Sequence, residues 1–270
     1  MAEPALLYEK RDGIAYLTIN RPDKRNSFSP EVLCRMADAW QDYAADDSLR
    51  VAIITGAGDL AFSAGADLGR LTPLTSGARK PEDEWDHRLL AHPELGQQAT
   101  LRGMAMYKPV IAAINGFCLA GGCELIQATD IRIAAEKATF ALTEVKWSLM
   151  PFAGSMTRLP RQIPYCKAME IMLVGDTFDA QEAYRIGLVN YVLPANQVMA
   201  KAEELARKIT ENGPLAVRRI KQVVLNALGL PLDEGFKLEN AAAKEILATD
   251  DAKEGPRAFM EKRKPKYTGK

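Results

Sequence analysis

The chain has 270 residues, of which 47% are hydrophobic and 26% are charged, a balance typical of a folded globular protein. Thirty-five basic and thirty-five acidic residues cancel to a formal charge of zero. This balance argues against the broad positive field that nucleic-acid binding usually requires, so we expect no nucleic acid among the partners.

Targeting and metal-binding signals are absent from the sequence. The N-terminal MAEPALLYEKRDG has no apolar signal core, and no run approaches the ~18 apolar residues of a membrane span. The four cysteines have no CxxC spacing, and the two histidines, His87 and His92, form no ligand cluster. We therefore expect a cytoplasmic protein with reduced thiols, no bound metal and no membrane association.

The N-terminal segment predicts a β-hairpin followed by a helix. ALLYEK and IAYLTIN are β-prone runs on either side of an RDG turn. After a loop, Ser29 is a suitable N-cap and Pro30 fits the first helical position. Large apolar residues then recur at helical spacing, which predicts one buried face made of Val32, Leu33, Met36, Trp40 and Tyr43.

Short, continuously apolar runs predict buried strands at 51–55 and 110–116, and a further pair of strands at 130–142. Helix-length segments separate them, which favours repeated β-β-α or β-α units in an α/β fold. From about Ala180 onward the pattern becomes helical. This shift predicts a boundary near Pro194, with a core at 1–194 and a helical region at 195–270.

Two turns rich in small residues offer backbone amides to an anion. SAGAD (63–67) presents the N–H of Ala66, and LAGGCE (119–124) presents that of Gly121, where a helix opens and amides are unpaired. Two converging amides stabilise the oxygen of an enolate. The dinucleotide and phosphate-loop glycine fingerprints are both absent.

Glu124 follows the Gly-Gly pair and an apolar run, where burial of an unpaired carboxylate is costly. Its residue type and position allow two interpretations. It either makes a structural ion pair or cap, or transfers a proton in a reaction.

Seven segments, in order along nearly the whole chain, resemble the crotonase (enoyl-CoA hydratase/isomerase) superfamily. They are NRPDKRNSFS, AFSAGADL, KPVIAAINGFCLAGGCELIQATDIRIAAEKATFAL, TEVKWSLMPFAGSMTRLPRQI, AYRIGLVNYVLP, NGPLAVRRIK and DDAKEGPRAFMEKRKP. The resemblance implies a spiral of β-β-α repeats with a C-terminal helical trimerisation region. It also implies a homotrimer or a dimer of trimers.

The same resemblance assigns roles to the candidate site residues. Ala66 and Gly121 would supply the oxyanion-hole amides for the thioester carbonyl of an acyl-CoA substrate. Glu144 would transfer the C2 proton and Glu124 would activate the water, and such general acid–base help is worth ~10²–10⁴-fold. The implied activity is reversible hydration of a trans-2-enoyl-CoA to a 3-hydroxyacyl-CoA, with no cofactor.

Two alternatives remain open: a Δ3-Δ2-enoyl-CoA isomerase or other crotonase-fold acyl-CoA enzyme, and a non-catalytic scaffold. A Δ3-Δ2-enoyl-CoA isomerase needs only one proton-shuttling carboxylate, so the presence of both glutamates argues against it. The other alternative is a CoA-binding scaffold without turnover, which two intact glutamates also disfavour.

Residues for the CoA moiety follow from the resemblance as well. Lys24 and Arg25 lie where family members hold the CoA phosphates, and their charges suit that contact. Ala64, Asp67 and Leu68 lie in the segment that lines the adenine and pantetheine path in relatives.

Several residues depart from the family pattern. Ala120 replaces the first of three glycines, and we expect its methyl group to be tolerated. Ser148, Phe152 and Ser155 replace glycines in SLMPFAGS (148–155), which predicts a reshaped wall of the acyl pocket.

Overall fold

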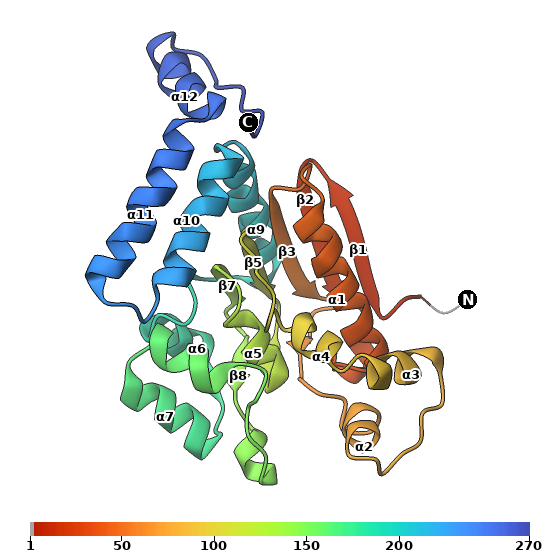
Figure 1. Cartoon of the computed structure of the whole chain (residues 1–270). Helices are drawn as coiled ribbons and strands as arrows, with labels where there is room; N and C mark the ends of the chain where they lie inside the picture. The colour runs from red at the N-terminus through yellow and green to blue at the C-terminus, as the bar shows by residue number, and fades with distance from the viewer. Residues whose placement is uncertain (1–2) are drawn as a thin grey trace.

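Two β-sheets form the framework of the computed structural model, which describes residues 3–270 (Figure 1). The larger sheet has the strand order β1-β2-β3-β5-β7-β10, with β1 antiparallel to β2 and the other neighbours parallel. Its strands are β1 (Leu6–Arg11), β2 (Ile14–Ile19), β3 (Val51–Gly56), β5 (Val110–Ile114), β7 (Ile131–Ala135) and β10 (Tyr191–Leu193).

The smaller sheet has the order β4-β6-β8-β9. Its strands are β4 (Ala61–Ser63), β6 (Phe117–Leu119), β8 (Thr139–Ala141) and β9 (Phe178–Asp179). The first three run parallel to one another, and β9 is antiparallel to β8.

The predicted hairpin and the helix after it are both confirmed. Asp12 and Gly13 turn between β1 and β2 with φ of 52° and 75°, the left-handed conformation that a tight hairpin turn needs. Helix α1 (Pro30–Ala45) begins after Ser29, whose side chain accepts a hydrogen bond from the Val32 N–H. The five apolar residues predicted to face the core are all buried.

The chain alternates between the two sheets, which produces the expected spiral of β-β-α units. Strands β3, β5 and β7 lie in the larger sheet, and each is followed by a strand of the smaller sheet, β4, β6 or β8. The two strands predicted in 130–142 therefore both exist, but they belong to different sheets. The helices that follow these strand pairs are α2 (Leu71–Thr75), α3 (Glu84–Ala91), α4 (Glu94–Ala99), α5 (Gly121–Ile126), α6 (Ser155–Gln162) and α7 (Tyr165–Val174).

The C-terminal part is helical, as predicted, although α6 and α7 already lie before Ala180. Its helices are α8 (Ala180–Arg185), α9 (Ala195–Thr210), α10 (Pro214–Ala227), α11 (Leu232–Leu247) and α12 (Asp250–Met260). Helix α9 packs against β3, β5 and β7, whereas α10 to α12 extend beyond the sheets (Figure 1). The division at Pro194 stays a prediction.

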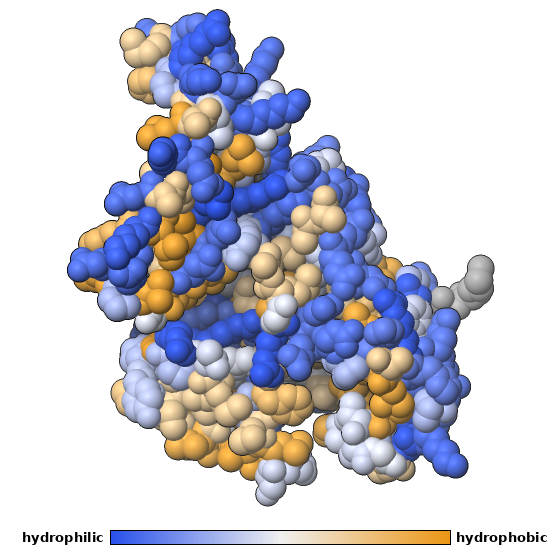
Figure 2. All heavy atoms as spheres, viewed as in Figure 1, coloured by the Kyte–Doolittle hydropathy of each residue, from blue (hydrophilic) through white to orange (hydrophobic). Residues whose placement is uncertain are grey.

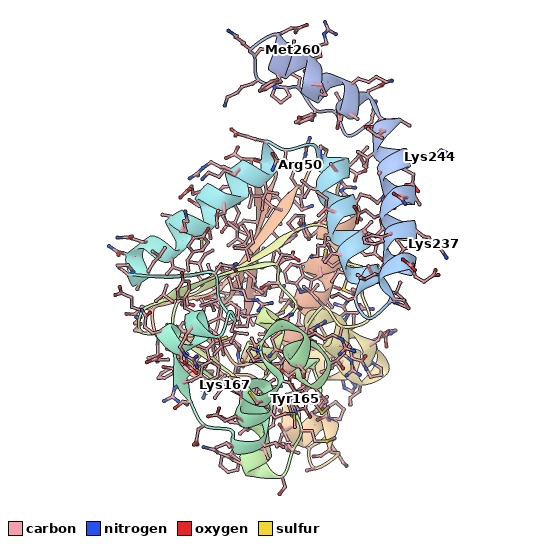
Figure 3. The ribbon with its side chains drawn as sticks, turned by 90° about the vertical axis from the view of Figure 1, so that its left-hand side faces the viewer. Arg50, Tyr165, Lys167, Lys237, Lys244 and Met260 are labelled. Atoms are coloured by element: carbon pink, nitrogen blue, oxygen red, sulfur yellow. The ribbon has the colours of Figure 1, made fainter. Side chains whose placement is uncertain are left out.

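Helices α10 to α12 carry large exposed apolar side chains among charged ones (Figure 2). Lys237 and Lys244 stand on α11 and Met260 at the far end of α12 (Figure 3). No helix in residues 3–270 has both the length and the apolarity needed to cross a membrane.

Candidate active site

The smaller sheet brings the predicted site residues to one edge. Strands β4, β6 and β8 are parallel neighbours, so their carboxyl ends meet at the same edge, the usual ligand-binding edge of parallel strands. The SAGAD turn follows β4, the turn before α5 follows β6, and Glu144 follows β8 by three residues. Three turns of the spiral thus each deliver one part of the site.

The two amide-bearing turns pack directly against each other. Gly65 has φ +83°, and a Cβ atom there would lie 2.7 Å from the Ala120 Cβ and 2.8 Å from the Gly121 nitrogen. Phe28 holds the first turn, because its N–H donates to Gly65 O and its carbonyl accepts from the Asp67 N–H. Within residues 3–270, neither the Ala66 nor the Gly121 N–H donates a hydrogen bond. The two candidate oxyanion-hole donors are therefore unpaired and lie in adjoining turns.

Ala120 occupies an unusual backbone conformation at the start of α5. Its φ is 47° and its ψ is −124°, a region that favours glycine because a Cβ atom crowds the backbone there. The structure accommodates the methyl group that replaces a family glycine, but at a strained position.

Glu124 is buried, with 3% of its surface exposed. The Ser155 N–H, at the start of α6, donates a 3.1 Å hydrogen bond to Glu124 Oε1. Burial raises the pKa of Glu124 to about 7, hydrogen bonds from Ser155 oppose the rise, and the nearby charge of Glu144 adds to it. A carboxyl with this pKa gains and loses a proton near neutral pH.

Glu144 begins the 3₁₀ helix η2 (Glu144–Trp147) and is half-buried. Its Oε2 atom is buried and has no hydrogen-bond partner among the described residues. Burial raises the pKa of this carboxyl above its ordinary value. Two neighbouring carboxyls that both favour the protonated form more than usual are suited to exchanging protons with a bound molecule.

The structure joins the predicted CoA loop to the SAGAD turn. Lys24 ends the 3₁₀ helix η1 (Pro22–Lys24), Arg25 follows it, and both side chains are exposed. The Ala64 N–H donates a 3.0 Å hydrogen bond to the Arg25 carbonyl. Leu68, 61% exposed, lies in the loop after this turn, so the cations and the apolar contacts predicted for CoA come from adjoining segments.

Asp67 makes an internal ion pair that the sequence analysis missed. Its Oδ2 atom lies 2.8 Å from Nη2 of Arg21, and its Oδ1 accepts from the N–H groups of Gly69 and Arg70. Burial opposes ionisation of Asp67, but Arg21 and these amides outweigh it and hold its pKa below the usual value. This carboxylate is thus already paired within the chain.

Asn26 was also missed. It is fully buried, its Nδ2 donates to the carbonyls of Ala57 and Ala61, and its Oδ1 accepts from the Arg21 N–H. With φ of 54° it adopts a left-handed conformation that asparagine tolerates better than most residues. In the sequence, only the neighbouring pair Arg25 and Asn26, directly after the turn at Pro22–Lys24, could have drawn attention to this residue.

The segment predicted to reshape the acyl pocket is largely exposed. Trp147, Met150 and Phe152 all have most of their surface accessible, and apolar side chains gather at the α7 and η2 end of the molecule (Figure 2). Ser148 has φ of 54°, a left-handed conformation that suits the glycine of the family pattern better than serine. Ser155, in contrast, is completely buried.

Both histidines are exposed. Among residues 3–270, no group of three or more histidine, cysteine, aspartate or glutamate side chains is placed to hold a metal ion.

Comparison with known proteins identifies the family. The family described as enoyl-CoA hydratase/isomerase matches residues 9–270. Enoyl-CoA hydratase EchA19 from Mycobacterium tuberculosis is 41% identical over 98% of this chain and 96% of its own length. Crotonyl-CoA hydratase from Syntrophomonas wolfei is 36% identical over 100% of both chains.

Solved structures agree with these sequences. The crystal structure of enoyl-CoA hydratase from Bacillus anthracis aligns with a TM-score of 0.88 at 36% identity, covering 98% of this chain and 100% of that one. The chain therefore belongs to the enoyl-CoA hydratase/isomerase family, as the resemblance of its motifs to the crotonase superfamily predicted.

Proposed function

We propose that this chain is an enoyl-CoA hydratase that reversibly adds water to a trans-2-enoyl-CoA and forms a 3-hydroxyacyl-CoA. One observation carries the proposal: two buried or half-buried glutamates with raised pKa values lie at the same sheet edge as two amides that have no acceptor among residues 3–270. The hydratase names of relatives such as the one from Syntrophomonas wolfei support it.

The proposed reaction balances without any other group. Glu124, ionised, accepts a proton from water as the water oxygen bonds to C3. The electrons of the double bond move toward the thioester oxygen, which Ala66 and Gly121 stabilise by donating their N–H groups; one such donor is worth roughly 2.7–4 kcal/mol. Glu144, protonated, gives its proton to C2, and proton exchange then restores both carboxyls.

This chemistry moves protons and one water molecule, so it requires no redox cofactor. The substrate is an acyl-CoA, and we assign its phosphates to Lys24 and Arg25 because both cations are exposed beside the SAGAD turn. Ala64 and Leu68 would contact the rest of the CoA moiety. Asp67 would act indirectly, through its ion pair with Arg21.

We further propose that the chain forms a homotrimer or a dimer of trimers through its C-terminal helices. Exposed apolar residues on these helices support an interface, among them Ile220, Val224, Phe236, Leu247 and Phe259. Light scattering of the purified protein would test the assembly, and a monomeric mass would contradict it.

The test of the activity is the loss of enoyl-thioester absorbance with crotonyl-CoA and with a longer trans-2-enoyl-CoA. We expect Glu124→Gln and Glu144→Gln each to lower kcat by ~10²–10⁴-fold while acyl-CoA binding persists. Glu136→Gln, at an exposed glutamate, is the matched control and should retain activity.

Three results would revise the proposal. Near-full hydration by Glu124→Gln would remove its role in activating water. A wild type that is inert on both substrates but isomerises a 3-enoyl-CoA would make the chain an isomerase, and binding without any turnover would make it a scaffold.

A further inference from the structure

Ser155 places a hydroxyl group beside Glu124, where the family pattern has glycine. Its backbone N–H donates to Glu124 Oε1 at 3.1 Å, a bond that glycine would also make. The side chain adds a second polar group to the site, and the residue has 0% of its surface exposed. A buried hydroxyl needs partners, because an unpaired polar group in the interior is costly.

Gln127 determines which way that hydroxyl points. Its Nε2 donates to the Cys123 carbonyl at 3.0 Å and to Ser155 Oγ at 2.8 Å. A carbonyl can only accept, so the amide atom facing Cys123 must be nitrogen rather than oxygen. Ser155 Oγ therefore accepts from Gln127, and its own proton is left to donate elsewhere.

Gln127 is itself held in place. It follows the last residue of α5, is buried, and its carbonyl accepts a 2.8 Å hydrogen bond from Gln162 Nε2 on α6. Reversing its amide would set two acceptors against each other at Cys123. The direction of the Ser155 hydroxyl is thus set by Gln127.

We propose that Gln127 and Ser155 form a positioning pair that directs the Ser155 hydroxyl proton onto the carboxylate of Glu124. This inference rests on the proposed function, because it concerns the carboxylate that activates water. The N–H of Ser155 already donates to Glu124, and the hydroxyl directed this way would be a second donor to the ionised form; both oppose the effect of burial on the pKa of Glu124. The glycine of the family pattern would supply only the backbone donor at this position.

The pair should keep more of Glu124 ionised at neutral pH. A base that activates water works only when ionised, so hydration falls as the pH drops through its pKa. Losing one hydrogen bond to a charged group corresponds to a rise of about one pKa unit. Removing the hydroxyl should therefore move the acid limb of the pH profile to higher pH.

The experiment measures kcat/KM against pH for hydration of crotonyl-CoA by the wild type, Ser155→Ala and Ser155→Gly. Both variants keep the backbone donor. We expect the acid limb to rise by about one pH unit, with activity about tenfold lower below it, equal activity at alkaline pH and an unchanged KM. The control, Thr157→Ala, alters an exposed hydroxyl on the same helix and should superimpose on the wild type.

Gln127→Met tests the other member of the pair. Methionine preserves the length of the side chain but has no side-chain N–H to donate to Ser155 Oγ. The Ser155 hydroxyl then loses its fixed direction, and the acid limb should also move to higher pH. An unchanged profile for Gln127→Met beside a shifted one for Ser155→Ala would overturn the role of Gln127.

Other outcomes overturn the proposal as a whole. Profiles of both Ser155 variants that superimpose on the wild type would do so, as would an equal loss of activity at every pH, which would indicate a structural role only. Difference infrared titration of the Glu124 carboxyl, identified with Glu124→Gln, gives the same answer without turnover. A shift in that titration in a protein that does not hydrate would uphold the pair and reject the proposed function.

Discussion

The guanidinium of Arg21 lies 2.8 Å from the carboxylate of Asp67 and joins the loop that carries Lys24 and Arg25 to the SAGAD turn. Both side chains are mostly buried, at 16% and 14% exposure. The pair holds two segments together that are more than forty residues apart in the chain, and both contain residues that we assign to CoA.

Breaking this ion pair should destabilise the protein. Removing one partner leaves a partly buried charge, so we expect Arg21→Met to lower the free energy of unfolding by about 2–3 kcal/mol. The double variant Arg21→Met with Asp67→Asn should lose no more than the single one, because it leaves no uncompensated charge. Urea denaturation of Arg21→Met, Asp67→Asn and the double variant measures both effects, and strictly additive losses would refute the coupling.

The exposed cations Lys24 and Arg25 should affect the binding of the acyl-CoA substrate and not the chemical step. We expect the double variant Lys24→Gln, Arg25→Gln to raise KM for crotonyl-CoA and to weaken its dependence on salt, with kcat unchanged. The corresponding pantetheine thioester has no nucleotide phosphates and should be used equally well by both proteins. Lys208→Gln, at an exposed lysine of α9, is the control. An equal loss with the pantetheine thioester would contradict a phosphate contact.

Gly65 offers a test of the amide pair. Gly65→Ala places a methyl group 2.8 Å from the Gly121 nitrogen, so we expect kcat to fall by about 10²-fold. Gly187→Ala is the matched control, because Gly187 has a similar φ of +79° but no atom within 4 Å of the added carbon. Gly187→Ala should lose about 1 kcal/mol of stability, Gly65→Ala should lose more because the added carbon clashes with Ala120 and Gly121, and only Gly65→Ala should lose activity. Equal kcat values would exclude this arrangement of donors.

The burial of Glu124 should make stability depend on pH. Its pKa is about 7 in the folded protein against 4.5 ordinarily, so the folded state binds this proton more tightly. The protonated Glu124 therefore stabilises the folded state fully below pH 4.5. This contribution to the free energy of unfolding is lost as the pH rises toward 7. Glu124→Gln should therefore gain about 3 kcal/mol relative to the wild type across that window. Denaturation at several pH values checks this, and a constant difference would contradict it.

The sequence predicted elements whose signals are local. The face of α1 repeats at helical spacing, and the turn at Gly13 has its own signature, so both could be recognised without the fold. The strands of the smaller sheet have at most three residues, too few for a periodic pattern. The sequence therefore did not reveal that β7 and β8 lie in different sheets. Helix α6 was missed because Pro160 lies inside it and interrupts a helical pattern.

The residues of the candidate site likewise divide into those with a local signal in the sequence and those without one. The amides of Ala66 and Gly121 and the carboxyl of Glu124 could be selected from turn chemistry. That they lie close to Glu144 could be predicted only from the family resemblance, because contacts between distant segments leave no local pattern in the sequence. The partners of Asp67 and Asn26 were missed for that reason.

The alternation between the two sheets has a consequence for changes in chain length. The loop between α2 and α3 lies away from the turns that directly follow the short strands, so it can lengthen or shorten without moving the candidate site. A single residue inserted within β4, β6 or β8 would instead reverse the faces to which its residues point. Such an insertion would turn one amide or one carboxyl away from the other two turns, and it would also move a buried core residue, Phe62, Cys118 or Phe140, to the opposite face.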